Sequence, residues 1–468
     1  MSDEASAVSA SRIPHPASRP SPAPPREYHF PTFERLTLRN GLALIIAPVR
    51  VLPVVTVTMV GPCGASSEPE GHEGVANLTA RALLEGSARS SGEELTERIE
   101  RLGAAIEAGA DWDSCVVTMT VLSDRLAPAF DLFAEVLLEP VFPEREVERL
   151  RAERLAELLQ LRTEPRGLAD EMFSRFLYAP DSRYAYPEDG GANTVASLTR
   201  TDLEAFYRAR YRPGGMTLIV AGDVSTDDAV ALAERAFGSW DGRAPSTPVV
   251  QDRPARLARA THLVEKAEAP QSELRIGQVG LPRTTPEYFP VLVMNGLLGG
   301  LFSSRINLNL REVHGYTYGA HSAFDWRRGA GPFVVASAVK SDVTAAAARE
   351  VLHEIDRMRT EPVTEEEISL ATSYLAGVFP IRYETTDAIA RALASLVVYT
   401  LPDDYFDTYR DRVRAVTRTD VLEAAQRHLH PDVLQLVVVG DPRVVAGQLE
   451  ELRFGPLEVY DAEGNVLT

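Results

Sequence analysis

The feature that most constrains the fold is an internal repeat. Residues 198–223, LTRTDLEAFYRARYRPGGMTLIVAGD, align without gaps to residues 416–441, VTRTDVLEAAQRHLHPDVLQLVVVGD, and nine of the 26 positions are identical. A second pair of segments, residues 114–124 and 332–342, keeps the same offset of 218 residues. Two separated matches in one register are not expected by chance. The sequence therefore predicts a duplicated domain of about 220 residues.

Each repeat contains patterns for both strands and helices. The β-branched runs that we predict to be strands are residues 42–49, 52–61, 115–122 and 217–223. Residues 143–162 carry apolar side chains at helical spacing and begin with Pro143, which suits a first helical position. Strands follow one another without regular alternation with helices. This order favours an α+β fold of two duplicated domains, each a mostly antiparallel β-sheet covered by helices.

Composition sets the expected domain boundaries. Residues 1–27 are rich in proline and serine, and we expect a disordered tail there. The two predicted domains are residues 28–240 and 261–468. Residues 241–260 are rich in proline and arginine and have little periodicity, so we expect them to form the linker.

Charge and composition also limit the location and the partners. A net charge of −19 argues against nucleic acid as a partner, and no run approaches 18 consecutive apolar residues, so we expect no membrane-spanning helix. Asp3 and Glu4 stand where a signal peptide would carry positive charge, which predicts a cytoplasmic protein. Cys63 and Cys115 lie in separate apolar, strand-like stretches. We expect neither a metal pair nor a disulfide from them, as suits a reducing compartment.

Common catalytic motifs are missing from the sequence. It contains no phosphate-binding loop, no GxSxG, no HExxH and no HxxEH. His428 and His430 lie in a helix-to-strand connection with no cysteine nearby, so we expect surface histidines there rather than ligands. The stretch GVANLTARALLEGS, residues 74–87, predicts a helix that ends near Gly86.

Three stretches resemble the insulinase/pitrilysin-type zinc peptidases and their relatives, the mitochondrial processing peptidases and the respiratory-complex core proteins. TLRNGLALIIAP (37–48) is similar to the family's opening, and GASSEPEGHEGVANLTARALLEGS (64–87) is similar to its metal-binding segment. LLGGLFSSRINLNLREVHGYTYGA (297–320) resembles the GG-x-x-SR…LRE-x-x-G-x-x-Y signature. The resemblance covers roughly residues 30–460.

The resemblance identifies where this chain departs from active zinc peptidases. In those relatives two His on one helical face bind zinc, a Glu between them activates the metal-bound water, and a distant Glu completes the coordination. Here Asn77 and Arg81 occupy the His positions, Ala80 replaces the Glu between them, and only Glu157 is retained. Arginine cannot bind zinc because its guanidinium stays protonated. We therefore expect a degenerate site without metal in this chain.

Two interpretations of Glu157 follow. It is either an ordinary charged residue on a helix rich in Glu and Arg, or one half of a buried ion pair in which Arg81 fills the space of the missing metal.

The second repeat retains the residues that the resemblance assigns to the substrate. In the family an Arg, followed seven residues later by a Tyr, reaches a zinc site from the second domain or from a partner subunit, where it binds the substrate carbonyl and stabilises the oxyanion. Arg311 and Tyr318 have this spacing and are the predicted catalytic and substrate-binding residues. Tyr316 stands only five residues from Arg311. The alternative is that the Arg and the Tyr serve the core.

Lost metal positions and a retained Arg/Tyr pair together predict a function. We expect a catalytically incomplete subunit of a heterodimeric zinc metallopeptidase, inactive alone, whose HxxEH-bearing homologous partner holds the zinc and hydrolyses peptides. The alternative is a non-enzymatic structural or peptide-binding protein similar to the respiratory core subunits. A stand-alone zinc peptidase is excluded by the degenerate positions. Edge strands could bind an extended peptide by strand addition, and we expect residues 332–340 to be one.

Overall fold

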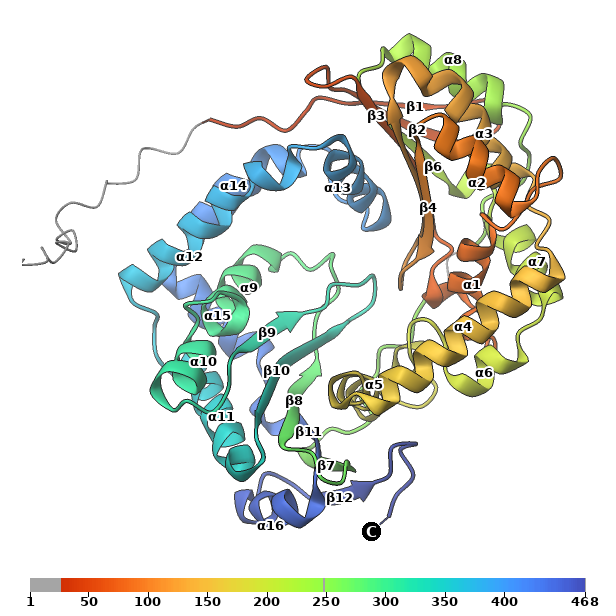
Figure 1. The fold of residues 1–468 in the computed structure, drawn as a ribbon. Helices are drawn as coiled ribbons and strands as arrows, with labels where there is room; N and C mark the ends of the chain where they lie inside the picture. Colours follow the sequence, from red (N-terminus) through yellow and green to blue (C-terminus); the bar gives the residue numbers. More distant parts are fainter. Residues whose placement is uncertain (1–26, 247–248, 468) are drawn as a thin grey trace, which may run out of the picture.

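The computed structural model describes residues 27–246 and 249–467, and Figure 1 shows them as two halves that each contain a β-sheet. Each sheet has six strands. In spatial order, the first sheet consists of β1 (Glu34–Thr37), β2 (Ala43–Pro48), β6 (Thr217–Gly222), β3 (Val54–Gly61), β5 (Cys115–Leu122) and β4 (Ala105–Ala110). The second consists of β12 (Leu457–Tyr460), β7 (Ala260–Glu265), β11 (Gln435–Gly440), β8 (Gln271–Val279), β10 (Pro332–Lys340) and β9 (Ala320–Phe324). Most of the predicted tail, residues 1–26, lies outside the described residues.

The two sheets share one topology. Strands β2, β6, β3, β5 and β4 take the same successive positions in the first sheet as β7, β11, β8, β10 and β9 take in the second. Most neighbouring strands are antiparallel. The parallel pairs among the described strands are β2–β6, β7–β11 and β7–β12. The predicted α+β fold, with two duplicated and mostly antiparallel sheets covered by helices, is confirmed.

The repeated sequence forms the same local structure twice. Each copy of the repeat forms a helix, α7 (Arg200–Arg210) in the first and α15 (Arg418–His428) in the second. The amides of Thr199 and Thr417 each donate a hydrogen bond of 2.8 Å to the carboxylate three residues later, which belongs to Asp202 and Asp420 respectively. This arrangement is a capping box, which satisfies a backbone amide at the helix N-terminus and fixes where the helix begins. Each helix then leads into a fully buried strand, β6 or β11.

Alternation along β5 separates the two faces of the first sheet. Val117, Met119 and Val121 are buried in an apolar core beneath the outer helices, whereas Thr118 faces the other way and shares a hydrogen bond with Thr58. The period of two places these polar residues on the side that faces the second half. The outer helices of this half are α2 (Gly92–Arg101), α3 (Leu126–Leu138) and α8 (Thr226–Phe237) (Figure 1).

The two halves exchange one helix each. Helix α5 (Pro165–Leu177) belongs to the first repeat but packs on β8 and β11 of the second sheet, and α13 (Thr386–Val398) of the second repeat packs on β3 and β6 of the first. The ring of Phe176 on α5 stacks on His262 of β7 at 4.4 Å between centroids. Thr386 and Thr56 share a hydrogen bond of 2.8 Å. The inner face of each sheet is thus covered by a helix from the other half.

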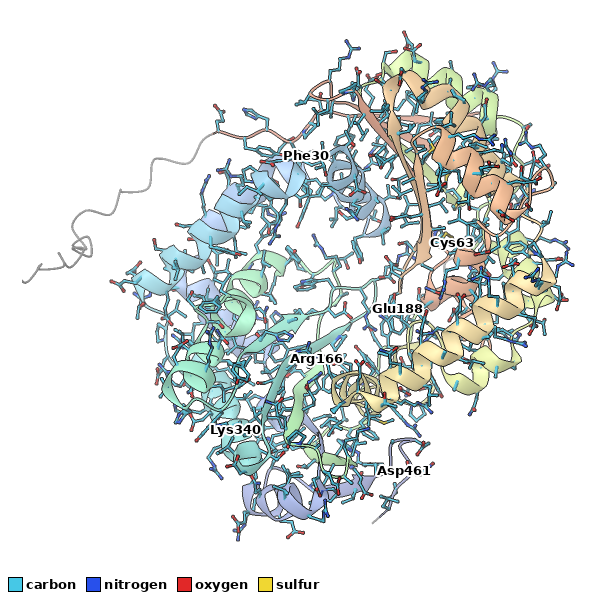
Figure 2. The ribbon with its side chains drawn as sticks, in the orientation of Figure 1. Phe30, Cys63, Arg166, Glu188, Lys340 and Asp461 are labelled. Carbon is cyan, nitrogen blue, oxygen red and sulfur yellow. A yellow bond between two sulfur atoms is a disulfide. The ribbon has the colours of Figure 1, made fainter. Side chains whose placement is uncertain are left out.

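One expectation about the cysteines is wrong. Cys63 and Cys115 form a disulfide, with their Cα atoms 5.0 Å apart. Strands β3 and β5 pair in a register that sets Gly61 opposite Cys115, which brings the residue two positions after β3 next to the start of β5. Figure 2 shows Cys63 in the loop that leads from the first sheet to helix α1 (Val75–Ala82). The spacing of the two cysteines in the sequence carries no information on this strand register, so the disulfide could not be predicted from it.

The expected edge strand is also wrong. Residues 332–340 form β10, which pairs with β8 on one side and with β9 on the other. The free edges at this end of the two sheets belong to β9 and β4. A hydrophobic strand that is buried in the interior of a sheet has the same pattern as a half-covered edge strand, so composition alone did not distinguish them.

One segment of the described chain, Tyr288–Val313, is long and apolar enough to cross a membrane, with a mean hydropathy of 1.3 over its best window. More than half of that window, 56%, is buried inside the protein, as in the core helix of a soluble domain.

The remaining α-helices of the described chain are α1 (Val75–Ala82), α4 (Glu144–Thr163), α6 (Ala192–Ser197), α9 (Tyr288–Asn295), α10 (Arg305–Asn307), α11 (Thr344–Thr360), α12 (Glu365–Val378), α14 (Tyr405–Arg414) and α16 (Pro442–Leu452).

Candidate functional site

Helix α1, the counterpart of a zinc-binding helix, is fixed at its N-terminus by a buried carboxylate. Glu68 accepts hydrogen bonds from the amides of Gly74 at 3.0 Å and Ala76 at 2.9 Å, and its other oxygen pairs with Arg183 at 2.7 Å. Burial raises the pKa of Glu68 to about 7, against the opposing effect of Arg183. Gly74 has a φ of 101° and lies against the Asp189 carbonyl, so a side chain would not fit there.

The degenerate metal positions lie on this helix. Ala80 is fully buried and Asn77 is half-buried. The guanidinium of Arg81 forms an ion pair with Glu157 at 3.5 Å and a second with Glu153 at 3.3 Å. The Arg81–Glu157 pair, one of the two interpretations of Glu157, is therefore present. It is not buried as expected, because the Arg81 side chain is 29% exposed and that of Glu157 is 47% exposed.

Helix α4 supplies the acidic partners. It begins at Glu144, one residue later than predicted, because Pro143 is its N-cap. Glu157 also accepts a hydrogen bond of 3.2 Å from Arg154, which in turn donates to the Asp189 carbonyl at 3.3 Å. Sequence reasoning missed Glu153, although its spacing of four residues from Glu157 places both carboxylates on one helical face.

This donor set does not fit zinc. Two of the positions that would hold ligands carry an amide and a guanidinium, and a guanidinium repels a cation instead of coordinating it. The remaining carboxylate, Glu157, is already paired with Arg81 and Arg154. Across the described residues, no three His, Cys, Asp or Glu side chains are grouped so that they could hold a metal ion. No hydrolytic step is therefore assigned to this half of the chain.

The second predicted site is exposed. Arg311 lies in the π-helical turn η7 (Leu308–Val313) with 37% of its side chain exposed, forms an ion pair with Glu312 at 3.4 Å, and lies over the ring of Phe302 at 4.8 Å. Tyr318 follows in the loop before β9 and is 92% exposed. Its hydroxyl makes no hydrogen bond with any described residue. Both side chains remain free to contact another molecule.

Tyr316, the neighbouring tyrosine, behaves differently. Its ring stacks on His314 at 4.9 Å and packs against the core of the second half. Its amide donates to the Leu310 carbonyl at 2.9 Å. Tyr316 therefore has the structural role that was the alternative for Tyr318, and the exposure of Tyr318 contradicts a role in the core.

The chain does not bring the two predicted sites together. Helix α1 belongs to the first half and α10, next to η7, to the second, and Figure 1 shows them on opposite sides of the molecule with α5 and the second sheet between them. Within the described residues, Arg311 and Tyr318 form no hydrogen bond or ion pair with α1 or α4. In this structure the two predicted sites are therefore separate.

A cavity of about 510 Å³ lies between the inner face of the first sheet and α13. Glu107 on the edge strand β4 lines one side, and it makes no hydrogen bond or ion pair with any described residue. Asp387 and Arg391, an ion pair on α13, line the other side. The free edge of β4, with Glu107, thus borders one side of the cavity, and the Asp387–Arg391 pair borders the other.

Comparison with known proteins assigns the family. Residues 50–182 match the description "Insulinase (Peptidase family M16)", and residues 197–375 match "Peptidase M16 inactive domain". The chain belongs to the insulinase family. It is a member that lacks the HxxEH motif.

Relatives of known sequence share most of this chain. An uncharacterized zinc protease of Mycobacterium tuberculosis is 28% identical over 417 residues, which cover 88% of this chain and 93% of the relative. One from Streptomyces coelicolor is 24% identical over 405 residues, covering 86% and 88%. Among insulinase-family structures, a peptidase M16 inactive domain from Pseudomonas fluorescens has a TM-score of 0.82 at 27% identity and covers 87% of this chain and 98% of its own.

Proposed function

We propose that this chain is the non-metal subunit of a heterodimeric zinc peptidase of the insulinase family. The observation that carries the proposal is the contrast between two arginines. Arg81 is paired with Glu157 and Glu153 where an active relative holds metal, whereas Arg311 pairs with its neighbour Glu312 and stacks on the exposed ring of Phe302, and Tyr318 is 92% exposed. The chain keeps the groups that act on the substrate and lacks those that activate water.

The chemistry of the exposed pair suits a peptide bond under attack. Zinc in the partner would supply the activated water. In this chain, Arg311 binds the substrate carbonyl and the Tyr318 hydroxyl donates to the oxygen as negative charge develops on it. Donors that are fixed before the reaction stabilise this charge without reorganisation, so each is effective in a site that excludes water.

Away from the bond on which Arg311 and Tyr318 act, an extended stretch of the peptide is proposed to bind along β4. Its free edge presents unpaired backbone groups that an added strand can satisfy, and the adjoining cavity has room for side chains. This proposal replaces residues 332–340, whose backbone groups are taken up by two neighbouring strands.

Two observations favour different cellular compartments for the protein. The N-terminal composition predicts cytoplasm, whereas the Cys63–Cys115 disulfide favours an oxidising compartment. Because both cysteines are buried, acid quenching of intact cells, alkylation in denaturant and a count of alkylated cysteines by mass spectrometry decide between the two compartments. Labelled cysteines support the cytoplasm, and protected cysteines support an oxidising compartment.

The test of the function is reconstitution. The purified chain is mixed with an HxxEH-bearing homologue from the same cells, and each sample is assayed for a 1:1 complex, zinc content and cleavage of a fluorogenic peptide. We expect the chain alone to hold no stoichiometric zinc and to be inactive, and the mixture to be active. An active complex that is unaffected by loss of Arg311 and Tyr318 would instead support the structural or peptide-binding alternative.

A further inference from the structure

Phe302 presents an aromatic ring beside Arg311 without being part of the core. Its side chain is 72% exposed, and it belongs to none of the hydrophobic clusters among the described residues. The guanidinium carbon of Arg311 lies 4.8 Å from the ring centroid. An aromatic face attracts a guanidinium and favours the rotamers that keep it stacked. The ring therefore restricts a long side chain that would otherwise move freely at the surface.

Asn307 connects the Phe302 loop to the loop that carries Tyr318. Its side chain is buried, with 5% exposed. Its amide nitrogen donates to the Phe302 carbonyl at 2.7 Å, and its amide oxygen accepts from the backbone of Ala320 at 3.1 Å. Ala320 stands two residues after Tyr318, so one buried amide fixes both loops at once.

The backbone on the other side of Tyr318 is fixed as well. The Thr317 hydroxyl donates to the Ala338 carbonyl at 2.7 Å and accepts from the Gly319 amide at 3.1 Å. Tyr318 thus has an anchored backbone on both sides and an exposed side chain. This arrangement keeps the hydroxyl accessible and limits the positions that it can reach.

We propose that Phe302 and Asn307 are positioning residues that hold Arg311 and Tyr318 in one relative geometry before a substrate arrives. The inference rests on the proposed function of that pair. Phe302 acts on the Arg311 side chain through the stack, and Asn307 acts through the backbone of both loops. Positioning of this kind matters most for groups that act on the transition state, since a misplaced donor loses its effect there.

The experiment uses the reconstituted heterodimer with a fluorogenic peptide, four positioning and control variants of this chain, and the Arg311→Ala and Arg311→Lys variants as references. Phe302→Leu removes the aromatic face at an exposed position, and Phe302→Tyr keeps it. Asn307→Ala removes both ties between the loops. Asn40→Ala is the matched control, because that amide also donates to backbone carbonyls, those of Phe237 and Trp240, but lies in the first half and ties neither loop. Thermal unfolding of each variant checks the fold.

We expect Phe302→Leu to lower kcat about 2- to 5-fold with little change in KM, the size of a stack at an exposed site. Phe302→Tyr should restore the parental kcat. Asn307→Ala should have a larger effect than Phe302→Leu because it frees both loops, and Asn40→Ala should leave kcat unchanged. In the isolated chain, the Nε–Hε NMR signal of Arg311, identified by its loss in Arg311→Lys, should move when the ring current of Phe302 is removed.

Two results distinguish the inference from the proposal beneath it. If Arg311→Ala lowers kcat while Phe302→Leu and Asn307→Ala keep the parental value, positioning is overturned and the proposed function stands. If Arg311→Ala itself leaves kcat unchanged, both fall together. Should Asn307→Ala fail to fold, the comparison of Phe302→Leu with Phe302→Tyr and the Arg311 signal decide the question.

Discussion

The two halves of the molecule share one sheet topology but differ in how their polar residues are used. In the first half, Arg81 closes on Glu153 and Glu157, so the charges of the degenerate site satisfy one another. In the second half, Tyr318 is 92% exposed, and Arg311 pairs with its neighbour Glu312 and keeps 37% of its side chain exposed. Apolar packing maintains both folds, while a few polar positions carry the chemistry. A site can therefore be lost from one half without loss of its architecture.

The largest effect is expected when the exposed site of the second half loses its tyrosine hydroxyl. Tyr318→Phe removes one hydroxyl from a side chain that is 92% exposed, so neither packing nor assembly should change. Loss of an oxyanion donor costs roughly 10²–10³ in turnover. The measurement is kcat of the reconstituted heterodimer, with the complex checked by gel filtration.

Two variants calibrate that result. Tyr316→Phe should be much milder because its ring is stacked on His314 and does not reach out. Arg311→Lys keeps the charge but loses the planar fork, so it should also lower kcat. Near-normal turnover for both Tyr318→Phe and Arg311→Lys would make this subunit a scaffold.

The next effect belongs to the first half. Cys63 and Cys115 close a loop across 52 residues, and the matching position in the repeat of residues 332–342 is Phe333, which cannot form such a bond. Replacing both cysteines with alanine should lower the free energy of unfolding by about 2–4 kcal/mol, mainly because the unfolded chain gains freedom. Urea unfolding with and without a reducing agent measures this loss. A double-alanine variant as stable as the oxidised parent would show that the bond contributes nothing.

A third effect tests the contact between the halves. His262 of β7 is buried between Phe176 from the first half and Tyr460, and burial lowers its pKa to about 4. The unfolded chain binds this proton near pH 6.5, so it holds more protons than the folded chain between pH 4 and 6.5. Stability from this group is complete above pH 6.5 and is lost as the pH falls towards 4, by at most about 3 kcal/mol.

Phe is the matched replacement at this position because it keeps a ring against Phe176 but cannot bind a proton. In His262→Phe, the fall in Tm between pH 6.5 and 4 should be smaller than in the parent. If Tm falls equally with pH in the two proteins, the acid sensitivity belongs to other groups. Glu68 is not one of them, because its contribution to stability changes with pH in the opposite direction. Its raised pKa of about 7 gives the folded chain the extra proton, so its contribution falls as the pH rises from 4.5 to 7.

Much of the fold was predictable from the sequence, and the reason is the repeat. Thr199 with Asp202, and Thr417 with Asp420, are local signals that form the same box in both halves. The exchange of α5 and α13 was not predictable, because helical periodicity shows that a helix has an apolar face but not which sheet receives it. The disulfide and the interior position of β10 depend on strand register and order, which are set by long-range contacts.

The candidate site was predictable only as far as its motif extends. Arg311 and Tyr318, and the degenerate positions of Arg81 and Glu157, were identified from the resemblance to the family motifs and the spacing that those motifs give. Phe302 and Asn307 carry no signal of their own, because a stack and two backbone hydrogen bonds appear only once the chain is folded. The exposure of the Arg81–Glu157 pair was equally invisible, since it depends on what packs around α1 and α4.

The smallest effect is expected when metal ligands are restored at the degenerate site of the first half. Asn77→His, Ala80→Glu and Arg81→His together should create a zinc site in which Glu157 is the remaining ligand, because Arg81 no longer pairs with it. Removing Glu157 from that variant should weaken zinc binding about 10-fold or more. Competition with a fluorescent chelator measures the affinity, and circular dichroism checks the fold, because Ala80 is fully buried and a larger side chain must find room there. A folded triple variant that binds zinc no better than the parent would show that the register assigned to α1 is wrong.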